Sequence, residues 1–240
     1  MKETRINKYL SEVGYCSRRA ADKLIDQGRI TINGEVPEMG TKITESDEVR
    51  VDGKLISQPT DKPIYIAFNK PKGIVCTTDS KRERNNIIDY INYPTRIFPI
   101  GRLDRPSEGL IFLTNDGDIV NKILRARNNH EKEYIVCVHK PLTEEFIKKI
   151  GNGVPVLNTY TKKCLVEQLD EKQFRIVLTQ GLNRQIRRMC EHFDYRVTKL
   201  TRIRIMNVNL DVPTGKWRDL TSNELKEINR LVEDSSKTID

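Results

Sequence analysis

The side chain with the clearest potential for chemistry is Asp104, which lies in a glycine-flanked segment between two apolar stretches. The segment, residues 101–110, has the sequence GRLDRPSEGL, and the apolar stretches are residues 97–100 and 110–113. Connections of this kind place reactive groups on a rigid sheet, so Asp104 is a candidate catalytic carboxylate. Arg102 and Arg105 lie on either side of it. Aspartates in turns also bond their own backbone, so the segment alone leaves a purely structural role open.

A second candidate segment, residues 181–193, combines an apolar helical face with a row of arginines. The positions that should face the core at helical spacing are Ile186, Met189, Cys190 and Phe193. A charged set repeats this spacing one register on: Arg184, Arg187, Arg188 and Glu191. Asn183 can cap this helix. Three cations near a helix start oppose the helix dipole, so an RNA phosphate or a buried carboxylate is expected nearby.

The charge balance favours a polyanionic partner. The chain of 240 residues has a formal net charge of +8. Residues 175–204 contain eight Arg and Lys against Glu191 and Asp194, a local excess of +6. Neutralising phosphates and releasing their counterions would draw such a surface to nucleic acid. A solvated charged face is the alternative.

Other classes of protein are disfavoured. The five cysteines form no CxxC or Cys/His cluster, and the three histidines are scattered, so we expect no disulfide framework and no metal site. The N-terminus has no apolar signal core, and no stretch approaches the roughly 20 apolar residues that a membrane span needs. A reducing cytoplasm fits this pattern.

The elements that would position these residues fall into two parts. Residues 1–57 begin with two short helices, the second capped by Ser17, followed by short strands with tight turns at 33–34 (NG) and 52–53 (DG). Residues 1–30 hold seven basic and four acidic side chains. The basic set is a candidate phosphate-binding surface, with a solvated face as the alternative. Its proposed RNA-binding members are Arg5, Lys8, Arg18, Arg19, Lys23 and Arg29.

Residues 58–63 are polar and proline-bearing, as in a linker. Residues 64–240 then show many short strands, with helices expected at 118–125, 143–150, 183–193 and 221–232. The last carries a capping box formed by Thr221 and Glu224. Strands without regular helical crossovers predict an α+β domain with a mainly antiparallel mixed sheet and flanking helices.

The first part resembles an S4 RNA-binding domain. The resemblance is carried by SRR at the start of the second helix, by QGRITING at its exit and by the later VRVDG strand. It implies that the helix pair docks on folded RNA. From spacing alone, a helix-turn-helix DNA reader remains a rival.

The second part is similar to the bacterial ribosomal RNA pseudouridine synthases of the RsuA/RluB/RluE/RluF group. The matching strings are NKPKG at 69–73, GRLDRPSEGLIFLTNDG at 101–117, NNHEKEY at 128–134 and NRQIRRMCEHFDYRVTKLTRIRI at 183–205. The F type fits best, also through the tail IMNVNL…GKWRDLT. Arg184 stands where many relatives have histidine, a departure that bears on the substrate rather than on the reaction.

This resemblance implies a reaction and a set of roles. Uridine in RNA would be flipped out and isomerised to pseudouridine, with no cofactor and no metal. Asp104 would act at the ribose, paired with Arg187, while Tyr134 packs on the uracil above an apolar floor at Ile186. Arg102 would fill the gap left by the flipped nucleotide. The remaining expected substrate-binding residues are Arg184, Arg188, Asn69 and Lys70.

The resemblance also suggests the substrate. The F type favours large-subunit (23S) ribosomal RNA and leaves a tRNA anticodon stem-loop open as a second target. We expect the protein to be a monomer. Rival hypotheses are the same chemistry on small-subunit ribosomal RNA, a non-catalytic S4-type RNA-binding protein and, more distantly, a DNA-binding regulator.

Overall fold

The computed structural model describes residues 3–57, 63–124 and 129–233. Most of the predicted linker, the end of the helix expected at 118–125 and the first residue of the NNHEKEY string lie outside the described residues. The chain divides into two compact units, formed mainly by residues 1–63 and mainly by residues 64–240. None of the helices in the described ranges is long and apolar enough to cross a membrane.

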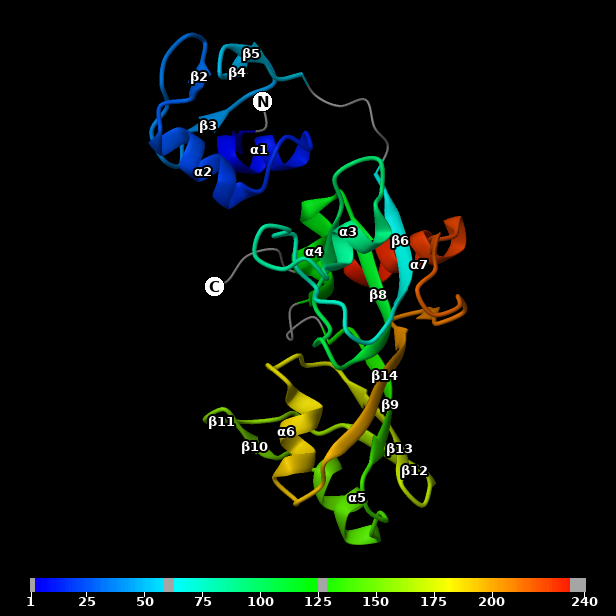
Figure 1. Cartoon of the computed structure of the whole chain (residues 1–240). Coiled ribbons are helices and arrows are strands. Elements are labelled where there is room, and N and C mark those ends of the chain that lie inside the picture. The colour runs from blue at the N-terminus through cyan, green and yellow to red at the C-terminus, as the bar shows by residue number, and fades with distance from the viewer. Residues whose placement is uncertain (1–2, 58–62, 125–128, 234–240) are drawn as a thin grey trace. The chain divides into compact units, whose positions relative to one another are not determined.

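The N-terminal unit contains the expected pair of helices and short strands (Figure 1). Its elements are β1 (Thr4–Arg5), α1 (Ile6–Glu12), α2 (Arg18–Asp26), β2 (Ile30–Ile32), β3 (Lys42–Ile43), β4 (Val49–Val51) and β5 (Lys54–Leu55). The Ser17 side chain caps α2 by accepting a hydrogen bond from the Ala20 amide at 3.2 Å. Both predicted turns have left-handed backbone at each residue, with φ of 52° and 91° at positions 33–34 and 50° and 75° at 52–53. Such conformations suit Asn-Gly and Asp-Gly.

The second unit is built on a mixed sheet that, in the described residues, has nine strands in the order β12-β13-β9-β14-β8-β6-β16, with β15 on β14 and β7 on β8. Its strands are β6 (Tyr65–Lys70), β7 (Phe98–Ile100), β8 (Glu108–Thr114), β9 (Lys132–Val138), β12 (Leu165–Asp170), β13 (Gln173–Leu178), β14 (Val197–Ile205), β15 (Val208–Asn209) and β16 (Trp217–Asp219). Neighbours are antiparallel except β14 and β8, which are parallel. The predicted α+β class with a mainly antiparallel mixed sheet is confirmed.

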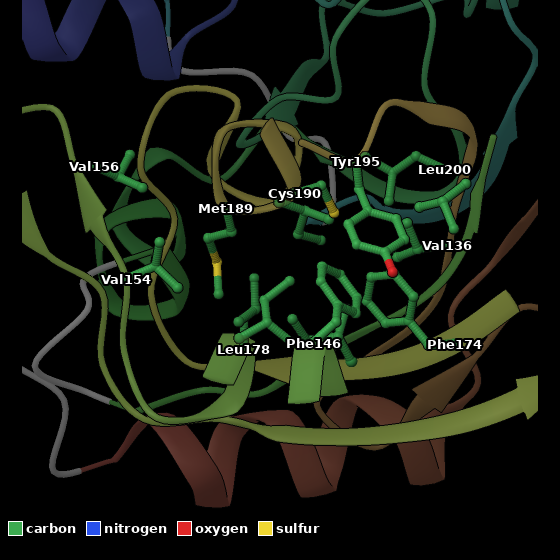
Figure 2. Close-up of a cluster of buried hydrophobic side chains, with 14 residues drawn as sticks. Val136, Phe146, Val154, Val156, Phe174, Leu178, Met189, Cys190, Tyr195 and Leu200 are labelled. Atoms are coloured by element: carbon green, nitrogen blue, oxygen red, sulfur yellow. The ribbon is translucent and has the colours of Figure 1, made fainter. Parts of the chain in front are cut away.

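Helices flank this sheet and pack against it in two separate hydrophobic clusters. They are α3 (Ile87–Ile91), α4 (Gly117–Leu124), α5 (Glu144–Gly151), α6 (Gln185–Glu191) and α7 (Ser222–Val232), and a small hairpin is formed by β10 (Pro155–Val156) and β11 (Thr159–Tyr160). One core packs α4 and α7 on β6 and β8. The other packs α5 and α6 on β9, β13 and β14, with Phe146 and Phe174 at its centre beside Tyr195 (Figure 2).

Two helix starts test the capping predictions. The capping box of α7 is present, with the Thr221 side chain and Glu224 each bonded to the other's backbone amide. The cap predicted at Asn183 is wrong: the residue before α6 is Arg184, in left-handed conformation at φ 51°, and it makes no side-chain cap. The Gln185 side chain instead accepts a hydrogen bond from the Leu182 amide at 3.0 Å. The helix expected at 183–193 therefore begins two residues later, at 185, and it ends at 191.

Candidate active site

A pocket of about 480 Å³ opens in the second unit where the loop before β8, the strands β9 and β14 and the start of α6 come together. This volume lies within the roughly 300–1,000 Å³ common for ligand sites. Among the residues that the structure describes, its charged lining consists of six basic side chains and one carboxylate: Arg102, Arg105, Lys132, Arg184, Arg187, Arg202 and Asp104. Such a lining suits an anionic substrate, and within the described part of the chain Asp104 is the one acidic group of the pocket.

Asp104 is held by its backbone in the connection from β7 to β8. Its carbonyl accepts a hydrogen bond from the Ser107 amide at 3.0 Å, and the next carbonyl, of Arg105, accepts one from Gly73 at 2.8 Å. Before it, the Leu103 amide bonds the buried Cys76 thiol at 3.3 Å. Among the described residues, the half-buried Asp104 carboxylate has neither a hydrogen bond nor an ion pair. A fixed backbone thus presents a carboxylate that is available to a substrate.

Arg187 of α6 is buried and bound to the Asp104 loop. Its Nη2 donates to the Ser107 Oγ at 3.0 Å and approaches the Pro106 carbonyl at 3.5 Å, while Nη1 donates to the Val197 carbonyl at 3.4 Å. Its Nε is buried and has no hydrogen-bond partner among the residues that the structure describes. The expected direct pairing with Asp104 is not among the ion pairs of the described residues, because backbone and hydroxyl acceptors take up the guanidinium.

The two charges still interact through space. Burial lowers the pKa of the Arg187 guanidinium, Arg184 adds to this lowering, and the negative charge of Asp104 opposes it. An opposite charge favours the ionised form of a buried group. Ser107 lies three residues after Asp104, and its hydrogen bond to Arg187 connects this guanidinium to the loop that carries the Asp104 carboxylate.

The aromatic and apolar residues expected around a base also line the pocket. Tyr134 lies half-buried on β9, and Ile186, at the start of α6, is 4% exposed. The exposed side chains of Arg102 and Arg184 line it as well. The structure thus brings together six of the nine residues expected at the site.

The other three do not line the pocket. Arg188 donates to the Asn183 carbonyl at 3.0 Å. Asn69 and Lys70 are buried at the end of β6, where Asn69 donates to the Val212 carbonyl at 2.8 Å. Lys70 Nζ donates to the carbonyls of residues 71 and 74 at 2.9 and 2.8 Å. All three donate hydrogen bonds to backbone carbonyls of nearby loops, so their placement indicates a supporting role in place of the expected substrate contact.

The basic residues expected to bind RNA lie in the N-terminal unit and differ in whether an acidic neighbour already binds them. Arg5, Arg18, Arg19 and Lys23 are exposed. Arg29 is engaged by Asp52 through two hydrogen bonds of 2.8 and 2.6 Å, and Lys8 forms an ion pair with Glu12 at 3.3 Å. The start of α2 therefore offers the more available guanidinium groups.

Ser107, Lys132 and Arg202 are among the polar pocket residues that were not predicted from the sequence. Strand periodicity could have indicated Lys132, since it lies two residues before Tyr134 and so on the same face of β9. No local signal marks Arg202, which reaches the site because β14 pairs with β9 and places it opposite Tyr134.

Comparisons with known proteins agree with this geometry. The family model described as RNA pseudouridylate synthase matches residues 64–192, and the S4 domain model matches residues 4–49. A crystal structure titled as that of a pseudouridylate synthase superposes with a TM-score of 0.68 at 29% identity, covering 95% of this chain and 99% of the other.

Curated relatives extend over nearly the whole chain. The dual-specificity RNA pseudouridine synthase RluF of Salmonella typhi is 58% identical over 97% of this chain and 81% of its own length. The protein of that name from Escherichia coli K12 is 56% identical over 98% and 81%. The ribosomal large subunit pseudouridine synthase B of Bacillus subtilis is 34% identical over 95% and 97%. The chain therefore belongs to the RNA pseudouridylate synthase family and carries an S4 domain ahead of its catalytic domain.

Proposed function

We propose that this pseudouridine synthase isomerises a specific uridine of 23S ribosomal RNA, and a uridine of a tRNA anticodon stem-loop, with Asp104 as its catalytic carboxylate. The observation that carries the residue assignment is the composition of the pocket. Among the described residues that line the pocket, Asp104 is the one carboxylate, and the other charged side chains are cationic. The large-subunit target is favoured by the relatives, of which one is named a ribosomal large subunit synthase and others dual-specificity synthases.

The chemistry requires little beyond these side chains. The bond between N1 of uracil and C1′ of ribose breaks, the base turns, and C5 joins C1′. The C5 proton then leaves, and N1 takes up a proton. The product is an isomer of the substrate, so no cofactor is consumed. The anomeric carbon is hidden inside an RNA fold, so the nucleotide is flipped into the pocket. Asp104 acts on the sugar, either by adding to C1′ or by taking a ribose proton, and both roles use the ionised carboxylate.

The neighbouring residues have assigned tasks in this scheme. Tyr134 and Ile186 sandwich the uracil, and Arg187 holds the loop that carries Asp104 through its hydrogen bond to Ser107. Arg102 and Arg184, exposed at the pocket, contact the RNA backbone and the gap in the RNA. In the N-terminal unit, the exposed cations of α2 bind phosphates of the same RNA.

The remaining assignments concern the state of the protein. We place it in the cytoplasm, consistent with free thiols at all five cysteines. We also propose that it acts as a monomer, which sedimentation of the protein with and without RNA tests directly.

The test of the proposal is Asp104→Asn, which keeps the shape of the side chain and removes its charge. Cells that lack the protein are complemented with wild type, Asp104→Asn or the control Asp219→Asn, whose exposed carboxylate lies on β16 away from the pocket. Pseudouridine is then mapped in 23S ribosomal RNA and in tRNA. We expect the control to restore modification in both RNAs and Asp104→Asn to restore neither while still binding RNA. Near wild-type modification by Asp104→Asn would end the assignment, and modification confined to small-subunit RNA would end the proposed target.

A further inference from the structure

Two cations at the pocket wall, Lys132 and Arg202, are buried without an acidic partner. Lys132 begins β9 and is 8% exposed, and Arg202 lies within β14 and is 3% exposed. Both line the pocket that contains Asp104. Neither forms an ion pair with any residue that the structure describes. Buried charges are normally paired, so this pair calls for an anionic or strongly polar partner from outside the chain.

Their hydrogen-bonding capacity is only partly used. Arg202 Nε donates to the Leu110 carbonyl at 2.6 Å, but its Nη2 atom is buried and has no hydrogen-bond partner in the described part of the chain. Lys132 Nζ makes one hydrogen bond, to the His130 carbonyl at 3.2 Å, and an ammonium has three donors. Lys70, which is also buried but outside the pocket, shows the contrast, because two backbone carbonyls accept from its ammonium. Of its three donors, Lys132 therefore leaves two unused where Lys70 leaves one.

Both cations lie beside the tyrosine that is proposed to stack on the base. The register of β14 on β9 makes Arg202 the partner of Tyr134, and the guanidinium carbon of Arg202 is 5.9 Å from the centre of the tyrosine ring. Lys132 precedes Tyr134 by two positions on β9, so the two side chains leave the strand on the same face. A uracil held against Tyr134 would therefore have both cations close to its edge.

The reaction produces charge on that base. When the C1′–N1 bond breaks, its electron pair goes to N1 of uracil and spreads onto the carbonyl oxygens O2 and O4, while C1′ becomes electron-poor on the side of Asp104. The charge disappears again when C5 forms its bond to C1′; the C5 proton then leaves and N1 takes up a proton, so that the product is a neutral isomer. Fixed donors aimed at charge that develops during a reaction lower its barrier most effectively in a site that excludes water.

We propose that Lys132 and Arg202 form an anion subsite that binds the carbonyl oxygens of the flipped uracil and stabilises the negative charge that the base carries while it is detached from the ribose. This inference rests on the proposed function, since it takes the base to be held at Tyr134 with the ribose at Asp104. The rival source of negative charge is a phosphodiester of the RNA. The depth of the pair favours the base, because exposed arginines of the same pocket are better placed to meet phosphates.

The experiment compares full-length Lys132→Met, Lys132→Arg and Arg202→Met with wild type on a 23S ribosomal RNA transcript, under single-turnover conditions with saturating enzyme. Lys132→Met keeps the length of the side chain and removes the charge, whereas Lys132→Arg keeps the charge. We expect Lys132→Met and Arg202→Met each to slow the maximal rate by about 100-fold, the loss typical of one preorganised oxyanion donor. The dissociation constant for RNA should stay within about threefold, and Lys132→Arg should recover most of the rate. Lys226→Met on α7, outside the pocket, is the control and should match wild type.

A second readout separates chemistry from mere misplacement of the site. The substrate is prepared with 15N at N1 of uracil and the isotope effect on kcat/KM is measured. If the cations act on bond cleavage, Lys132→Met makes that step slower relative to binding, and the isotope effect rises above the wild-type value. A structural role would reduce the amount of active enzyme and leave the isotope effect unchanged.

The outcomes that overturn the inference are distinct. One such outcome is weaker RNA binding at an unchanged maximal rate, with the slope of log K against log salt reduced by about 1. This result would mean that the pair binds a phosphodiester of the RNA. Wild-type rates in Lys132→Met and Arg202→Met, or slow rates with an unchanged isotope effect, would also refute it. Asp104→Asn is measured alongside: if it is inactive while Lys132→Met is normal, this inference alone fails. If Asp104→Asn is active, the proposed function itself fails.

Discussion

Replacing Lys132 by methionine should stabilise the protein in the absence of RNA, because the buried ammonium then has no anionic partner that offsets its loss of hydration. Burial, with a smaller contribution from the charge of Arg202, lowers the pKa of Lys132 from 10.5 to about 8. A difference of 2.5 pKa units at ~1.36 kcal/mol per unit makes the charged side chain about 3 kcal/mol less favourable in the folded than in the unfolded state. Methionine fills similar space but loses the hydrogen bond to the His130 carbonyl, which offsets about 1 kcal/mol. We therefore expect a net gain of about 2 kcal/mol at pH 7.

The sign of the pH dependence follows from the lowered pKa. Below pH 8 the lysine is charged in both states and its destabilising effect is fully present. Between pH 8 and 10.5 the unfolded chain holds more protons than the folded one, so the wild type recovers stability as pH rises. The advantage of Lys132→Met over wild type should therefore be largest at pH 7 and shrink by roughly 1 kcal/mol per pH unit above pH 8.

The measurement uses the sole tryptophan of the chain. Trp217 lies on β16, so its fluorescence follows unfolding of the catalytic unit in urea. Wild type, Lys132→Met and the exposed-site control Lys226→Met are compared at pH 7 and pH 9.5. A Lys132→Met protein that is less stable than wild type at pH 7, or whose stability difference does not change with pH, would refute the idea that a buried, unpaired cation is retained for the substrate.

Three further changes test the architecture of the site and the RNA surface. Gly109→Ala should destabilise the catalytic unit by roughly 2–4 kcal/mol, because the φ of Gly109 is +104° and an added Cβ would lie 2.3 Å from a backbone oxygen of β14. Urea unfolding measures this loss, and wild-type stability of the variant would contradict the prediction. Ser107→Ala should lower kcat about 10-fold with little change in RNA affinity, since it removes a hydrogen bond of Arg187 worth roughly 1.5–3 kcal/mol. Single-turnover rates and binding titrations measure rate and affinity separately. An effect on affinity alone would argue against a role of Ser107 in positioning Arg187. Arg18→Glu combined with Arg19→Glu should weaken RNA binding and reduce the slope of log K against log salt by about 2, and an unchanged slope would exclude these residues from the interface.

The features that the sequence determined by itself are those set by nearest neighbours along the chain. Ser17 caps α2, Thr221 and Glu224 form the capping box of α7, and the Asn-Gly and Asp-Gly pairs occupy left-handed turns. Each depends on a hydrogen bond or a backbone preference that spans a few residues, so residue type and spacing are sufficient.

The exception at α6 shows where local rules stop. Asn183 is a good capping residue by type, but the chain turns one position later, with Arg184 in the left-handed region. Ile186, Met189 and Cys190 are buried against β9 and β13, and this packing sets where the helix begins. Burial of an apolar face outweighs the hydrogen bond of a single cap.

The surroundings of the catalytic groups were decided only by the tertiary structure. Arg187 meets Ser107 from 80 residues away along the chain, and Arg202 meets Tyr134 because β14 inserts between β8 and β9. The sequence indicated which side chains are charged, but not which of them lose water or remain without a partner. Burial and pairing are properties of the packed sheet, and the electrostatics of this pocket depend on both.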